Sequence, residues 1–198
     1  MDILVKEVSF TEKIKNSTFL SELLICNSQN EAREIIKAQK TKYDDARHVV
    51  HAFIVGNGAE ICGMSDDGEP SGTAGRPVLD VLKGRNCTNC ILTITRWFGG
   101  TLLGTGGLVQ AYSAGAKQVI QKADEENAFS LLVSKTPFSF SCDYSSYNII
   151  KNKLEPFNLF DISEIFGENI TLRGFIQSDE FELLAQMLKN LSNGKILL

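Results

Sequence analysis

The chain has 198 residues, of which 43% are hydrophobic and 22% charged, and its formal net charge is −4. This composition excludes a disordered chain, and no apolar run approaches the roughly 20 residues that a membrane-spanning helix needs. The 20 basic and 24 acidic side chains divide as 14 and 16 over residues 1–134 and as 6 and 8 over residues 135–198. Each part is therefore acidic, which disfavours nonspecific polyanion binding.

The N-terminus and the cysteines indicate the compartment. The opening residues carry an acid at position 2 and lack the basic-then-apolar pattern of a signal peptide. The five cysteines are an odd number spread along the chain, which makes a poor disulfide framework and fits reduced thiols. We therefore expect a cytoplasmic protein without a membrane partner.

The first part of the chain alternates strands with helices. Strands are expected at residues 3–10, 17–25, 49–55, 60–64 and 91–96. A capping box, Ser28–Glu31, predicts one helix, and Pro77 fits the first turn of a second at 76–82. A third helix should follow Gly107 and run to about residue 123. Its core stripe has steps of three and four: Leu108, Tyr112, Ala116, Val119 and Ala123.

A polar break at residues 124–127 separates this part from the rest. We place one domain at 1–130 and a second at 135–198. In the second domain, alternation at 138–144 predicts a strand, followed by a helix, two strands near 158–166 and 169–177, a second helix, and a last strand at 195–198. The order βαββαβ is that of a ferredoxin-like fold, so the fold class is α+β.

Two predicted helix starts are rich in glycine. The first contains Gly72, Thr73 and Gly75, with Arg76 beside it, and the second runs through Gly104, Thr105, Gly106 and Gly107. Free amides at a helix start attract phosphates and carboxylates, and glycine lets a ligand approach the backbone. Glycine also occurs in tight turns, so either segment alone is weak evidence for a ligand site. Two such segments in one domain favour an anion site.

Arg96 lies at the end of a predicted strand, on the side that Leu92 and Ile94 bury. Its guanidinium stays charged and needs a carboxylate or a phosphate. One interpretation is an internal salt bridge to Asp66, Asp67 or Glu69. The other is an anion ligand flanked by Trp97 and Phe98, which could stack on a base, and by Gly99 and Gly100.

The acidic cluster Asp66, Asp67 and Glu69 allows two interpretations. The carboxylates could hold magnesium, or Glu69 could be a general base. Alternatively they cap the following amides and neutralise Arg76 or Arg96, because Asp-Gly and Glu-Pro are favoured in turns. We favour the structural interpretation.

No other residues form a convincing catalytic or metal-binding set. Cys87 and Cys90 lack the second ligand pair that a structural zinc requires, and we interpret them as loop-end thiols. His48 and His51 should lie on opposite faces of a strand, with His51 in the core. Without a Ser-His-Asp or Cys-His set, covalent hydrolysis has little support, and we assign no catalytic residue, metal or cofactor.

Three motifs resemble the signature of the IMPACT/YigZ family: the run from Ser65 to Gly75, Arg96–Gly100, and Leu103–Leu108. Lys15–Phe19 and Ala46–Phe53 are similar to two further family elements. Met64 and Trp97 depart from the family pattern, which more often has a bulky aromatic residue and a tyrosine there. The tail from Lys135 resembles the small C-terminal domain of bacterial members, so the resemblance covers nearly the whole chain.

The resemblance implies a first domain with the fold of the second domain of ribosomal protein S5. It implies a second domain similar to the last domain of elongation factor G. Eukaryotic members of the family regulate translation with help from an additional domain that this chain lacks, so their partner does not carry over. The resemblance therefore implies a role in translation that involves RNA or the ribosome. Similarity of fold alone supports little more than this.

We therefore expect a non-enzymatic protein in which Arg76, Arg96 and the two helix starts hold RNA phosphate and Trp97 or Phe98 contacts a base. One alternative is an enzyme acting on a phosphorylated small molecule, with Glu69 or Asp67 as base or magnesium ligand. Another is a protein-interaction module that binds a partner through the open sheet face of the C-terminal domain.

Overall fold

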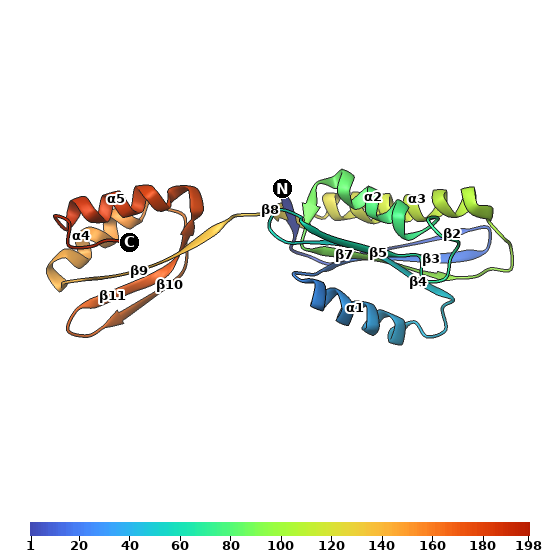
Figure 1. Ribbon diagram of the computed structural model, residues 1–198, viewed down its shortest axis with the longest axis horizontal. Coiled ribbons are helices and arrows are strands. Elements are labelled where there is room, and N and C mark those ends of the chain that lie inside the picture. The colour runs from blue at the N-terminus through green and yellow to red at the C-terminus, as the bar shows by residue number, and fades with distance from the viewer. The chain divides into compact units, whose positions relative to one another are not determined.

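The chain folds into two units. In the computed structural model, which describes residues 1–198, Met1–Leu132 and Val133–Leu198 form separate units, each with its own core (Figure 1). Both units contain helices and strands, so the α+β class is confirmed. No helix combines the length and the apolar character that crossing a membrane requires.

A five-stranded antiparallel sheet forms the centre of the first unit. Its order is β2 (Val8–Ile14), β3 (Ser17–Ile25), β7 (Cys90–Trp97), β4 (His48–Val55) and β5 (Ile61–Ser65). The central strand β7 places Arg96 opposite Phe19 on one side and opposite His48 on the other. The end of β7 is therefore surrounded by neighbouring strands.

The expected single strand at residues 3–10 is wrong. The chain breaks at the exposed residues Val5–Glu7, so β1 (Asp2–Leu4) leaves the main sheet. It lies between β6 (Cys87–Thr88) and β8 (Phe129–Leu131) in a separate three-stranded sheet. These two short strands were not expected from the sequence, because their pairing depends on residues far apart in the chain.

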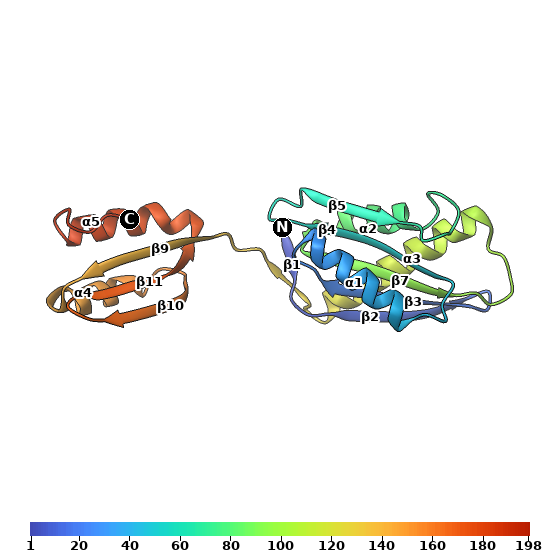
Figure 2. The same cartoon turned by 60° about the horizontal axis from the view of Figure 1, so that its bottom comes forward.

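Helices cover both faces of the main sheet. The helix α1 (Gln29–Lys42) lies on one face, and α2 (Gly75–Arg85) and α3 (Gly104–Glu125) lie on the other (Figures 1 and 2). The predicted stripe of α3 from Leu108 to Ala123 is buried throughout, which confirms the helical periodicity. However, Gly104–Gly107 forms the first turn of α3, whereas the sequence indicated a loop that precedes the helix.

The second unit contains β9 (Lys135–Cys142), α4 (Tyr144–Leu154), β10 (Leu159–Phe166), β11 (Ile170–Gln177) and α5 (Phe181–Leu191). A 3-10 turn, Ser178–Glu180, precedes α5. The sheet has the order β10-β11-β9, and residues of α4 and α5 share its core. Its strands and helices follow the predicted order up to α5.

The expected last strand at 195–198 is wrong. Ser192 uses the backbone amides that such a strand would need: its carbonyl accepts from Lys195 at 3.2 Å and its hydroxyl accepts from Ile196 at 2.8 Å. Ile196 still packs into the core. The apolar pattern of the tail therefore correctly indicates that Ile196 is buried, but the tail adds no strand to the sheet.

Candidate anion-binding site

The start of α2 is already occupied by a carboxylate of the chain. Asp66 accepts hydrogen bonds from the amides of Gly72, Ala74 and Gly75 at 2.9, 3.0 and 2.8 Å. Burial opposes ionisation of Asp66, but the three amides outweigh it and hold the pKa of this carboxyl below its ordinary value. The first glycine-rich segment therefore caps a helix with an internal anion.

Arg76 lies on the surface and does not line a cavity with Arg96. Its Nε donates to Asp80 at 2.8 Å along α2, and both side chains are more than half exposed. Pairs of this kind are worth little in water. The expected convergence of Arg76 with Arg96 is not met, because the start of α2 directs Arg76 toward solvent.

Arg96 forms a buried ion pair with Glu69. Its Nη1 lies 2.6 Å from Glu69 Oε1, and that oxygen also accepts from the hydroxyl of Tyr112 at 2.8 Å. Burial and the adjacent carboxylate raise the pKa of Tyr112 well above its ordinary value, so the hydroxyl remains a donor. Of the two interpretations of Arg96, the internal salt bridge is present, and Glu69 is the partner.

Asp67 is also engaged within the protein. Its carboxylate pairs with Lys40 and accepts from the Val49 amide at 2.7 Å, while its carbonyl lies 2.8 Å from His48 Nδ1. No three His, Cys, Asp or Glu side chains are grouped so that they could hold a metal ion. The acidic cluster thus organises the loop 65–75 by bonding to cations and amides, as the structural interpretation expects.

A cavity of about 330 Å³ lies where β7 ends and α3 begins. Arg96 and His48 line it from the sheet, and Arg47 and Phe98 line it from the ends of their strands. The start of α3 contributes Gly104 and Thr105. The ring centroid of Phe98 lies 5.7 Å from the guanidinium carbon of Arg47 and 5.6 Å from that of Arg96. Further lining comes from Gly68, Glu69, Pro70, Leu102, Leu103 and Leu108.

Several donors at this cavity have no partner in the protein. No side chain caps α3, whereas Asp66 from the preceding loop accepts from the amides at the start of α2. Arg96 is 5% exposed, and its Nε is buried without a hydrogen bond. Arg47 is exposed, and its contact is with Phe98 rather than with a carboxylate. Amides of a helix start and two guanidinium groups are the donors that a phosphate or carboxylate requires.

The predicted site residues thus divide into two groups. Arg96, Phe98, Gly104 and Thr105 line the cavity. Trp97 packs edge-on against Tyr43 with ring centroids 5.6 Å apart, and the residues 72–76 belong to the α2 start described above. Gly106 and Gly107 continue the first turn of α3.

Gly99 and Gly100 shape the loop that leaves β7. A Cβ at Gly99 would overlap the backbone of Asn16, and the Gly99 amide donates to Ser17 Oγ at 3.2 Å. Gly100 has a φ of 85°, in the region that favours glycine. Gly99 therefore lets the loop pass close to the β2–β3 turn, and Gly100 allows the left-handed backbone conformation that follows it.

Arg47 and His48 were not expected from the sequence. The feature that identifies them is the register of β4, which places His48 directly opposite Arg96. The alternation of the strand correctly separated His48 from His51. However, only the pairing of β4 with β7 brings His48 to the glycine-rich loops.

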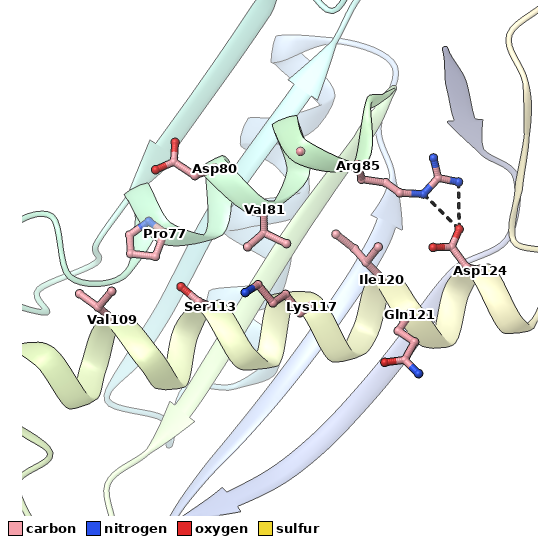
Figure 3. Close-up of a pocket in the computed structure, with 11 residues that line it drawn as sticks. Pro77, Asp80, Val81, Arg85, Val109, Ser113, Lys117, Ile120, Gln121 and Asp124 are labelled. Carbon is pink, nitrogen blue, oxygen red and sulfur yellow. Dashed lines mark hydrogen bonds and ion pairs between the residues drawn. The ribbon is translucent and has the colours of Figure 1, made fainter.

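A larger cavity of about 670 Å³ lies between α2 and α3 (Figure 3). Val81 and Ile120 point into the space between the two helices, and Arg85 at one end donates to Asp124 at 2.9 Å. At the other end Asp80 is paired with Arg76. This groove contains little of the family motifs, and several of its charged groups already have partners, so the smaller cavity is the better candidate for an anion.

Comparisons with known proteins agree with this architecture. The family model for the Impact N-terminal domain matches residues 15–120. An IMPACT family member of Haemophilus influenzae is 33% identical over 96% of this chain and 92% of its own length, and YvyE of Bacillus subtilis is 32% identical over 92% and 82%. YigZ of Escherichia coli is 34% identical over 69% of this chain and 66% of its own.

A solved structure has the same two-unit fold. A crystal structure described only as that of a hypothetical protein superposes with a TM-score of 0.68 at 28% identity, over 98% of this chain and 94% of the other. The translational regulator Yih1 matches with a TM-score of 0.38, which is too low to inform the fold. The molecule is a two-unit α+β protein with a basic cavity at a helix start. It belongs to the IMPACT family.

Proposed function

We propose that this protein has a translation-linked role and binds RNA, free or within the ribosome, through the cavity at the start of α3. The single observation that carries the proposal is the uncapped start of α3, which faces Arg96 and Arg47 in one cavity. Membership of a family whose eukaryotic members regulate translation supports the cellular setting. The volume, about 330 Å³, suits one phosphate group with part of a sugar or base.

The charges suit a single weakly held phosphate. Glu69 neutralises much of the charge of Arg96, so the attraction comes from Arg47, the remaining donors of Arg96 and the amides of Gly104 and Thr105. A phosphate contact of this kind orients an RNA without reading its sequence. Phe98, which is 38% exposed beside both guanidinium groups, offers a ring face to a neighbouring base.

Fluorescence anisotropy with a labelled RNA, measured over a salt series, tests this proposal. Arg47→Gln should weaken binding and reduce the slope of log K against log salt by about 1. Arg33→Gln is the matched control, because Arg33 is an exposed arginine on α1, outside the cavity. If the RNA does not bind, or if both variants bind as the wild type does, the proposal fails.

His48 favours a second candidate, an enzyme acting on a phosphorylated small molecule. Its Nδ1 lies 2.8 Å from the Asp67 carbonyl, which can only accept, so the neutral ring carries its proton there. Nε2 is then free to accept a proton at the cavity, 3.9 Å from Glu69 Oε1. His48 is better placed as a base than Glu69, whose Oε1 accepts from both Arg96 and Tyr112.

This enzyme hypothesis predicts that a sugar phosphate or nucleotide, with magnesium, raises the melting temperature through binding to the native state. Turnover of that compound should be lost in His48→Gln. A panel of phosphorylated metabolites that produces no shift would exclude it in favour of the RNA proposal.

A further inference from the structure

One face of the sheet in the second unit carries no helix. The helices α4 and α5 pack on the side where Phe138, Phe140 and Leu172 are buried (Figure 1). The alternate residues of each strand point to the opposite side, which we call the open face. Its positions on β9 and β11 are Lys135, Pro137, Ser139, Ser141, Thr171, Arg173, Phe175 and Gln177, and on β10 they include Phe160, Ser163 and Ile165.

Two aromatic rings and one proline ring lie in one row across the open face. The register pairs Phe160 of β10 with Phe175 of β11, and Phe175 with Pro137 of β9. Phe175 is 39% exposed, although a phenylalanine in a small domain is ordinarily buried. Hydrogen-bonded strands are about 4.8 Å apart, so the rings form a continuous apolar strip across the sheet.

The charge of the open face is opposite to that of its unit. Residues 135–198 contain 8 acidic and 6 basic side chains, but the open-face positions of β9 and β11 carry no acid and two cations, Lys135 and Arg173. Neither cation takes part in an ion pair. Lys135 Nζ instead lies 4.1 Å from the ring centroid of Phe160.

Several acids of the unit lie away from the open-face positions of β9 and β11. Asp143 caps α4, and Glu164 faces the helical side, where it pairs with Lys151. Glu180 accepts from the Asn158 amide at the start of β10, and Asp161 lies at the bulge of that strand. The positive charge at the open-face positions of β9 and β11 is therefore local, and the net negative charge of the chain does not reveal it.

We propose that the open face binds single-stranded nucleic acid, with bases stacked on Phe175 and Phe160 and phosphates held by Lys135 and Arg173. Aromatic rings on an open sheet with basic side chains beside them are a general solution for exposed bases, because every base has a π-face. A duplex hides its base faces in the stack and cannot use the rings. This surface consists of residues of the second unit, whereas the α3 cavity consists of residues of the first.

The composition of the open face favours a nucleic acid over a protein. The core of a protein interface is depleted of lysine and serine, whereas here Lys135, Ser139 and Ser163 surround the rings. The hydroxyl and amide groups of Thr171 and Gln177 add hydrogen-bonding partners for phosphates and sugars. A second copy of the chain would bring the same two cations against each other.

The test is the binding of a fluorescein-labelled oligouridine dodecamer to the full chain, followed by anisotropy at several salt concentrations. Phe175→Leu keeps an apolar side chain at an exposed position and removes the ring, and we expect it to weaken binding about tenfold. Lys135→Gln combined with Arg173→Gln should reduce the salt slope by about 1.4, since each single-strand phosphate contact contributes about 0.7. Lys153→Gln with Lys189→Gln, which removes two exposed lysines from α4 and α5, is the matched control and should bind as the wild type does.

The outcomes separate this proposal from that for the α3 cavity. Loss of affinity in Phe175→Leu with full retention in Arg47→Gln supports the open face and overturns the cavity, and the reverse pattern overturns the open face. A dodecamer duplex that binds as tightly as the single strand also overturns it. So does sedimentation velocity that reveals a dimer which Phe175→Leu dissociates, because the face would then belong to a second copy of the chain.

Discussion

Glu69 Oε1 and Arg96 Nη1 lie 2.6 Å apart, and the two side chains are only 4% and 6% exposed. A buried pair contributes little net stability, because the attraction offsets the loss of hydration. Removing one member strongly destabilises the fold, since the other remains charged and buried without water or a partner. The pair thus fixes the loop 65–75 to the end of β7, and it also determines how much positive charge reaches the α3 cavity.

The first prediction concerns this pair. Glu69→Ala should lower the free energy of unfolding by about 3–5 kcal/mol, because the Arg96 guanidinium is left buried without a carboxylate. Asp80→Ala removes the exposed partner of Arg76 and should change it by less than about 0.5 kcal/mol. Urea unfolding at pH 7 measures both. Equal, small effects would mean that Arg96 finds water or another acceptor.

The second prediction concerns the Asp66 cap. Its pKa in the folded protein is below the unfolded value of about 4, so its contribution to stability is complete above pH 4 and is lost as the pH falls through the folded value. Asp66→Asn should therefore destabilise the protein at pH 7, and the difference from wild type should shrink below about pH 4. Thermal unfolding between pH 3 and 7 measures it. A constant difference would contradict the role assigned to the ionised carboxylate.

The third prediction compares two glycines. Gly99→Ala places a Cβ against the Asn16 carbonyl and should cost about 2 kcal/mol or more, because backbone atoms on both sides must move. Gly84→Ala, in α2 where a Cβ meets nothing, should instead stabilise by about 0.5–1 kcal/mol. Equilibrium unfolding distinguishes the two signs. If Gly99→Ala is neutral, the loop after β7 does not pass as close to the β2–β3 turn as described.

The fourth prediction concerns the thiols. Cys62 is exposed, while the other four cysteines are buried, and burial raises the pKa of Cys26 to about 11. A thiol reagent at pH 8 should therefore modify one cysteine rapidly in the native protein and all five in urea. Cys62→Ser should abolish the rapid phase. A second rapid thiol would show that one of the four buried cysteines is more accessible than the structure indicates.

Much of the fold could be predicted from the sequence, because periodicity reports burial. The stripe from Leu108 to Ala123 and the alternation of Phe138, Phe140 and Cys142 specify α3 and β9 without reference to the rest of the chain. The strands β6 and β8 have two and three residues and exist only because β1 lies between them. The missing last strand depends on where Ser192 directs its hydrogen bonds, which no apolar pattern reveals.

The candidate site was predictable only in part. The glycines, Arg96 and the acidic cluster identify the region, and both the ligand-binding and the self-neutralising interpretations fit the same residues. Asp66 satisfies one helix start, whereas the other has no capping side chain, and this difference depends on distances between atoms. The sequence does not indicate a role for Arg47, because its position beside Phe98 follows from the pairing of β4 with β7.

The most direct test of the central claim is an amide-resolved NMR titration of the protein with a 5′-phosphorylated dinucleotide. We predict that the amides of Gly104, Thr105 and Gly106 shift with saturation, because they are the uncapped first turn of α3. The amide resonances of Gly72, Ala74 and Gly75 should not shift, since these amides already donate to Asp66. Equal shifts at both helix starts, or none at α3, would contradict the account.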